Sequence, residues 1–155
     1  MKRNFIMTKY EYLIEQERTS ENIWFHGTKS KFDIFDLSYF GETDDGWWGV
    51  GVYFHSNIEN AKAYGINIIK ASFKTDKILN LPTYDSGQYL YNILNDLGLN
   101  IPSEYKNYSA MNIISNIGKH EFTNFIKAYF DVMVINYTEG TKEAIVFNTN
   151  ILEIF

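Results

Sequence analysis

The sequence predicts an α+β fold, because strand-like and helical segments occupy separate stretches of the chain. Short runs of β-branched and aromatic residues dominate the stretch up to residue 81. A block with apolar residues three to four positions apart follows, and strand-like runs return near the end. No internal repeat or linker separates these parts, so a single domain is expected over residues 1–155.

The elements expected in the first part of the chain are short. They are an N-terminal helix within residues 1–21, strands over residues 22–26 and 50–54, and a short helix that ends at Gly65. Ser56 and Glu59 are spaced as a capping box, which predicts that this short helix begins at Ser56. The glycines just before the second strand indicate a hinged loop.

The second part of the chain is predicted to contain a helical block between strands. The expected elements are strands over residues 66–73 and 78–81, helices over residues 86–97, 111–117 and 119–130, and strands over residues 132–135, 143–147 and 151–155.

Charge and composition restrict the partners. The formal net charge is −5, so no general electrostatic field attracts nucleic acid or an anionic membrane, although a local basic groove remains compatible with it. The chain has no cysteine, which excludes a disulfide framework and a thiolate nucleophile. No apolar run approaches the ~20 residues of a membrane span, and the N-terminal apolar run is too short for a signal peptide. We therefore expect a cytoplasmic protein.

Three polar residues lie on apolar strands: His26, Tyr53 and Glu143. Taken singly, each has an ordinary structural interpretation, as a hydrogen-bonded histidine, a core aromatic and a solvated glutamate. The nearby Gly49-Val50-Gly51 is not a dinucleotide-binding loop, because the third glycine is missing and the loop precedes a strand instead of following one.

Together these residues match the motifs of a known family. The three matching segments, in order, are Phe25-His26-Gly27-Thr28, Gly49-Val50-Gly51-Val52-Tyr53-Phe54 followed by Ala61 and Tyr64, and Glu143-Ala144-Ile145-Val146-Phe147-Asn148. The chain resembles the ADP-ribosyltransferases, in the branch with a His-Tyr-Glu active site that poly(ADP-ribose) polymerases share with diphtheria-type toxins. The resemblance covers residues 24–155 and implies two packed, mostly antiparallel sheets flanked by helices around a NAD cleft.

The resemblance also implies roles for single residues. The catalytic residues would be Glu143, His26 and Tyr53, with Glu143 on the nicotinamide ribose and His26 on the adenosine-side ribose. Tyr53 and Tyr64 would sandwich the nicotinamide ring. The remaining NAD contacts would come from Gly27 and Thr28. NAD+ would be consumed as a substrate, and the chemistry requires no metal.

Two positions depart from the family pattern. Ala61 replaces a nicotinamide-binding serine of the polymerases, and Thr141 replaces the Glu or Gln that selects the acceptor in arginine- or asparagine-directed enzymes. No polymerase regulatory domain is evident in the sequence, so we expect transfer of a single ADP-ribose, to a protein acceptor, as by a microbial or phage effector. The alternatives are a NAD+ glycohydrolase, a tRNA 2′-phosphotransferase of the same fold, and a non-catalytic binding module. Net charge does not favour a nucleic-acid acceptor.

Other residues near these motifs leave alternatives open. Trp47 and Trp48 belong either to the core or to the entrance of the cleft. We interpret His55 as structural. The acidic loop with Glu42, Asp44 and Asp45 is expected to be solvated.

Overall fold

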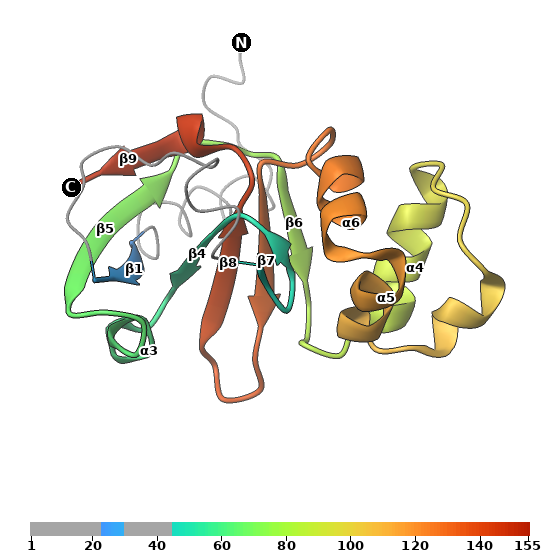
Figure 1. Ribbon diagram of the computed structural model, residues 1–155, viewed down its shortest axis with the longest axis horizontal. Coiled ribbons are helices and arrows are strands. Elements are labelled where there is room, and N and C mark those ends of the chain that lie inside the picture. The colour runs from blue at the N-terminus through green and yellow to red at the C-terminus, as the bar shows by residue number, and fades with distance from the viewer. Residues whose placement is uncertain (1–22, 30–44) are drawn as a thin grey trace, which may run out of the picture.

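A computed structural model describes residues 23–29 and 45–155. These residues form an α+β structure built on a curled seven-stranded sheet with the order β6-β7-β8-β4-β1-β5-β9 (Figure 1). Its strands are β1 (Trp24–Thr28), β4 (Val52–His55), β5 (Asn67–Phe73), β6 (Ile78–Leu81), β7 (Val132–Asn136), β8 (Lys142–Val146) and β9 (Leu152–Ile154). Only the β6–β7 pair of this sheet is parallel.

The sheet arrangement differs from the expected one. In place of two packed sheets, the described strands form this one sheet and a separate two-stranded hairpin of β2 (Asp45–Gly46) and β3 (Gly49–Val50). The physical reason is the position of β4, which pairs with β1 on one side and with β8 on the other. β4 therefore joins strands that would otherwise belong to two sheets.

The helices match the predicted positions with small changes in their ends. They are α3 (Ile58–Lys62), α4 (Gly87–Asp96), α5 (Ala110–Ile117) and α6 (Lys119–Ile126), with 3₁₀ turns η1 (Ser103–Asn107) and η2 (Thr149–Ile151). α6 ends four residues before the expected end at residue 130. The N-terminal helix predicted within residues 1–21 lies outside the described residues. Of the helices described, none is both long and apolar enough to cross a membrane.

The predicted start of α3 was wrong. The residue that caps this helix is Asn57, whose Oδ1 accepts a hydrogen bond from the Glu59 backbone N–H at 2.8 Å. The Ser56 hydroxyl instead accepts from the Lys142 backbone N–H on β8 at 2.8 Å. The Ser56 side chain, which the local pattern assigned to the helix cap, thus bonds a strand that is distant in the sequence instead.

Two apolar cores lie on opposite faces of the sheet. Successive side chains of β7 alternate between them, with Met133 and Ile135 in one core and Val132 and Val134 in the other. Helices α4, α5 and α6 cover the first face, on the β6–β7 side of the molecule (Figure 1). Trp48 belongs to this first core, and Tyr53 and Tyr137 pack against it.

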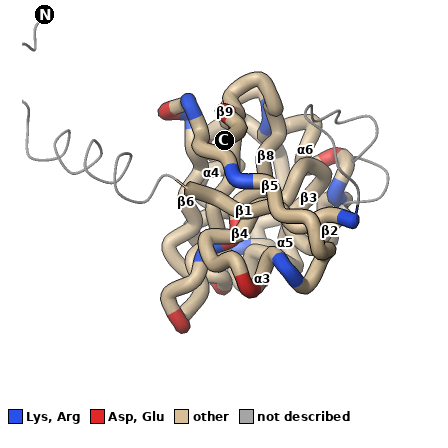
Figure 2. Tube along the Cα trace, turned by 90° about the vertical axis from the view of Figure 1, so that its left-hand side faces the viewer, with Lys and Arg blue, Asp and Glu red and all other residues tan. Residues whose placement is uncertain are grey.

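Acidic and basic residues are mixed on the side of the molecule that carries β1, β5 and α3 (Figure 2). The acidic loop residues Glu42 and Asp44 lie outside the described part of the chain, as does the side chain of Asp45.

Candidate active site

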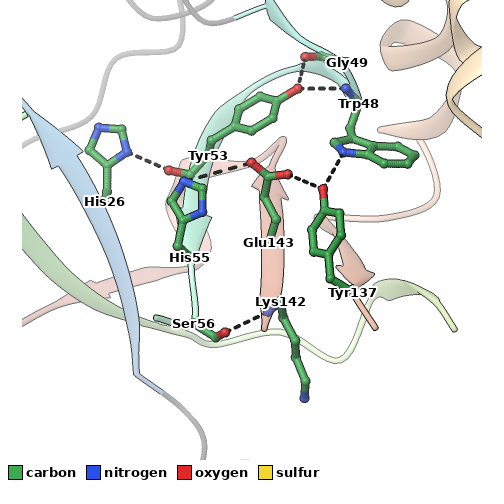
Figure 3. A network of polar contacts seen from close by, with 9 residues as sticks. All are labelled: His26, Trp48, Gly49, Tyr53, His55, Ser56, Tyr137, Lys142 and Glu143. Carbon is green, nitrogen blue, oxygen red and sulfur yellow. Dashed lines mark hydrogen bonds and ion pairs between the residues drawn. The ribbon is translucent and has the colours of Figure 1, made fainter. Parts of the chain in front are cut away.

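Three adjacent strands bring the predicted residues together. β1 contributes His26, β4 contributes Tyr53 and β8 contributes Glu143, and these strands are neighbours in the sheet. All three residues line one pocket, whose full lining is His26, Gly27, Gly46, Trp47, Trp48, Tyr53, His55, Tyr64 and Glu143. Figure 3 shows the polar contacts that these three residues make with their neighbours. It holds about 510 Å³ of empty space, its open mouth included.

Glu143 lies two residues before Ile145 on β8 and therefore on the same face of the sheet. This is the face that carries the first core, to which Ile145 belongs. Its side chain is 13% exposed, so it is not the solvated residue that the sequence alone favoured. Burial raises the pKa of the Glu143 carboxyl, and a hydrogen bond from Tyr137 opposes this rise. The site thus holds a partly desolvated carboxylate with a dedicated donor.

The donor to Glu143 comes from the turn between β7 and β8. Tyr137 Oη donates to Glu143 Oε1 at 2.9 Å and accepts from Trp48 Nε1 at 3.1 Å. Burial and the nearby Glu143 raise the pKa of Tyr137, so its hydroxyl keeps its proton near neutral pH. Residue patterns do not single out Tyr137, because it lies in a segment with the composition of a polar turn.

His26 is buried and bonded to the main chain of the neighbouring strand. Its Nδ1 lies 2.7 Å from the carbonyl oxygen of Tyr53. A carbonyl can only accept, so Nδ1 carries the proton and, in the neutral ring, Nε2 carries the lone pair. The ladder between β1 and β4 has one register pair, Phe25 with His55, and the imidazole supplies a further cross-strand bond beside it.

The Tyr53 hydroxyl is engaged by the β2–β3 hairpin. It donates to the carbonyl of Gly49 at 2.7 Å and accepts from the backbone N–H of Trp48 at 3.1 Å. A Cβ at Gly46 would lie 2.6 Å from the Tyr53 ring, so the hairpin packs directly on that ring. Gly49 has a φ of +120°, which glycine adopts without strain. Tyr53 therefore fixes the hairpin over the pocket as well as lining it.

His55, which the sequence analysis interprets as structural, also lines the pocket. It lies two residues after Tyr53 on the same strand, and therefore on the same face. Its ring stacks on Tyr64, with centroids 5.2 Å apart and an interplanar angle of 16°. Burial, with a smaller contribution from His26, lowers the pKa of His55 to about 4, so the imidazole is neutral at neutral pH. Tyr64 itself is 61% exposed.

Gly27 lines the pocket where α3 approaches β1. A Cβ at Gly27 would lie 1.8 Å from the carbonyl oxygen of Ala61, so only glycine permits this contact between the two backbones. Thr28, which the resemblance places on NAD, is half-buried at the end of β1 and is not among the residues that line the pocket.

The two tryptophans have different environments. Trp48 is 1% exposed and belongs to the first core, where its indole N–H reaches Tyr137. Trp47 is 70% exposed, lines the pocket and lies under the Lys119 ammonium, 5.7 Å from the ring centroid. Trp48 therefore belongs to the core, whereas Trp47 lies at the entrance of the pocket.

A second, more open pocket adjoins the first. It shares three lining residues with it, namely His55, Tyr64 and Glu143. Its other lining residues come from α3 and from the β7–β8 turn, and they are Glu59, Asn60, Ala63, Tyr137, Glu139, Thr141 and Lys142. Across the described ranges, no group of three or more His, Asp or Glu side chains is arranged to hold a metal ion.

Comparisons with known proteins give little beyond this geometry. No family model matches the chain, and no curated protein matches its sequence. One solved structure, described as the crystal structure of an anti-CRISPR protein, superposes with a TM-score of 0.44 at 11% identity, covering 86% of this chain and 94% of that one.

Proposed function

We propose that this chain is a NAD+-dependent ADP-ribosyltransferase with Glu143 as its catalytic carboxylate. The observation that carries the proposal is the convergence of His26, Tyr53, Tyr64 and Glu143 on one pocket, from strands β1, β4 and β8 and the turn after α3. These are the residues that the three sequence motifs supply in the His-Tyr-Glu branch. Their meeting point also has an aromatic wall, to which Tyr53 and Tyr64 contribute.

The proposed chemistry needs one carboxylate. Nicotinamide in NAD+ is already a cationic leaving group, so the bond between C1′ of the ribose and N1 breaks without a general acid. The electron pair leaves with nicotinamide, and positive charge develops on the ribose as in glycoside cleavage. Glu143, ionised and partly desolvated, stabilises that charge and hydrogen-bonds the ribose hydroxyl.

The aromatic residues position the substrate in this proposal. Tyr53 and Tyr64 would hold the nicotinamide ring between them, which orders the ground state more than it lowers the barrier. Tyr53 is itself held by Gly49 and Trp48, so its ring is already ordered before NAD+ binds. The resemblance places His26 on the adenosine-side ribose, and the hydrogen bond between Nδ1 and the Tyr53 carbonyl orients its ring.

The expected acceptor is a protein, modified with a single ADP-ribose. Thr141, in the place of a Glu or Gln, leaves the choice of acceptor to other residues of the second pocket. The mixed charge near α3 and the acidic composition favour a protein over a nucleic acid. A glycohydrolase differs only in using water as the acceptor, and a non-catalytic module would bind NAD+ without cleaving it.

Nicotinamide release from labelled NAD+ tests the proposal. Wild type is expected to release nicotinamide, and Glu143→Gln, which keeps size and hydrogen bonding but removes the charge, should lose at least about a hundredfold in rate. Glu104→Gln, an exposed glutamate on η1 that is outside both pockets, is the matched control and should equal wild type. NAD+ binding without release by wild type would favour the binding module.

Labelled NAD+ added to a lysate then separates transfer from hydrolysis. Label on protein bands with wild type, and not with Glu143→Gln, is expected for a transferase. Free ADP-ribose as the sole product would favour the glycohydrolase. Mass spectrometry of the labelled protein would identify the modified residue.

A further inference from the structure

His55 and Glu143 face each other across a gap that is too wide for a hydrogen bond. They are directly paired on β4 and β8, and His55 Nε2 lies 4.0 Å from Glu143 Oε2. A direct hydrogen bond would need a separation of about 3 Å. A single oxygen or nitrogen atom between them can lie about 2.8 Å from both. The pair therefore forms a two-point seat for one polar atom of a ligand.

The local contacts leave this seat available. Glu143 uses its other oxygen, Oε1, to accept from Tyr137. Within residues 23–29 and 45–155, the His55 imidazole makes no hydrogen bond to a protein group, and stacking on Tyr64 orients its ring. The His55 side chain is only 9% exposed. An imidazole that is buried and oriented in this way can use its ring nitrogens for hydrogen bonds to a ligand in the site.

The seat lies where the two pockets meet. His55, Tyr64 and Glu143 form the wall that both pockets share. The second pocket reaches this wall from the side of α3 and the β7–β8 turn, so a molecule that enters there meets the wall without passing through the first pocket. The two substrates of a transfer reaction need such an arrangement, because the attacking atom must approach C1′ from outside the NAD+ site.

We propose that His55 and Glu143 together hold the attacking atom of the acceptor, an uncharged O–H or N–H group that enters through the second pocket. This inference rests on the proposed function and assigns His55 a role that none of the three motifs contains. His55 Nε2–H donates to the attacking atom, and that atom donates its own proton to Glu143 Oε2.

The bonds and protons balance in this step. The C1′–N1 bond of NAD+ breaks, and its electron pair leaves with nicotinamide. A lone pair of the attacking atom forms the new bond to C1′, and its proton passes to Glu143 Oε2. Burial raises the pKa of Glu143 and lowers that of His55, so the carboxylate is the better proton acceptor of the two. A carboxylate has about four lone-pair sites, so Glu143 can hold the ribose hydroxyl as well.

Competition between water and methanol tests this role without knowledge of the natural acceptor. Each protein is incubated with NAD+ in buffer that contains methanol, and ADP-ribose and methyl ADP-ribose are quantified by chromatography. The variants are His55→Phe, which keeps a ring on Tyr64, and His55→Gln, whose amide nitrogen can reach the place of Nε2. The exposed His120→Phe on α6 is the matched control.

The loss of activity in His55→Phe should be confined to the step in which the nucleophile attacks C1′. His55→Phe should lower kcat about ten- to a hundredfold, as expected for one lost hydrogen bond to a reacting group, with KM for NAD+ within about twofold. The ratio of methanol to water products should change, since the seat no longer selects between them. His55→Gln should recover part of kcat, and His120→Phe should match wild type.

Each other result overturns the inference. If wild type cleaves NAD+ and His55→Phe keeps both kcat and the product ratio, His55 has no role in attack, while the proposed function stands. A rise in KM at constant kcat would assign His55 to NAD+ binding instead. If wild type releases no nicotinamide, the proposed function fails and this inference fails with it. If His55→Phe does not fold, equal rates for His55→Asn, which is too short to reach the seat, and His55→Gln contradict the inference.

Discussion

Tyr137 Oη lies 2.9 Å from Glu143 Oε1, although the two residues are separated by the whole β7–β8 turn. The turn closes through the Tyr137 N–H to the Thr141 carbonyl at 3.0 Å, and Gly140 adopts a φ of +97° within it. Trp48 then fixes the hydroxyl from the other side. Trp48, a core residue, therefore orients the Glu143 carboxylate through the Tyr137 hydroxyl.

Tyr137→Phe should shift the acid limb of the pH–rate profile to higher pH. The Tyr137 hydrogen bond lowers the pKa of Glu143 against the rise that burial causes, so its removal lets that pKa rise further. The charged form of Glu143 is then reached only at higher pH. In addition, kcat should fall about tenfold, as expected for one charge-assisted hydrogen bond. The measurement is nicotinamide release against pH.

The control for this prediction is Tyr108→Phe. Tyr108 also donates to a glutamate, Glu104 at 3.3 Å, but this exposed pair lies outside both pockets. Its removal should leave the profile of wild type. An acid limb that stays in place in Tyr137→Phe would show that Tyr137 does not set the ionisation of Glu143.

Tyr53→Phe should loosen the hairpin over the pocket. The substitution keeps the ring but removes the bonds to the Gly49 carbonyl and from the Trp48 N–H. We expect a loss of about 1–2 kcal/mol in the free energy of unfolding, and a higher KM for NAD+. Chemical denaturation and steady-state kinetics measure the two effects. Tyr129→Phe, which removes one long bond at 3.5 Å, should be close to neutral, and equal stability of both variants would contradict the prediction.

Gly27→Ala should be strongly destabilising. The added Cβ would lie 1.8 Å from the Ala61 carbonyl oxygen, so α3 must move away from β1. Overpacking of this kind costs about 1–3 kcal/mol or more. Gly140→Asn is the comparison, because a Cβ there would meet no atom within 4 Å and the only cost is the backbone strain of a φ of +97°, which Asn tolerates better than most residues. Thermal unfolding measures both variants, and a Gly27→Ala midpoint equal to that of wild type would refute the close approach.

The free energy of unfolding should decrease as the pH is lowered, and part of this decrease should come from His55. Burial lowers the pKa of His55 from 6.5 to about 4, so below pH 6.5 the unfolded chain binds a proton that the folded chain does not. The free energy of unfolding therefore decreases between pH 6.5 and 4, by about 1–3 kcal/mol from this group. His55→Gln removes this contribution and should show a shallower decrease in denaturation experiments. The same decrease in both proteins would place the titration elsewhere.

Much of the local structure follows from residue patterns. The strand alternation of β7 and β8 and the apolar spacing of α4, α5 and α6 are visible in the sequence, and these elements form where they were expected. The same alternation carried a signal for His55 that our interpretation missed, since residues two apart on a strand share a face. Tyr137 offered no such signal, because its position depends on how a turn folds back over β8.

The α+β class, most of the element positions and the residue types available for chemistry follow from the order of residues alone, because helical and strand periodicity are local properties. The tertiary structure decided which of those residues meet. β4 pairs with both β1 and β8, which merges two expected sheets into one and sets His55 opposite Glu143. It also assigned Trp48 to the core, Trp47 to the pocket mouth and Ser56 to β8. These outcomes depend on strand order and register, which are set by contacts between segments far apart in the chain.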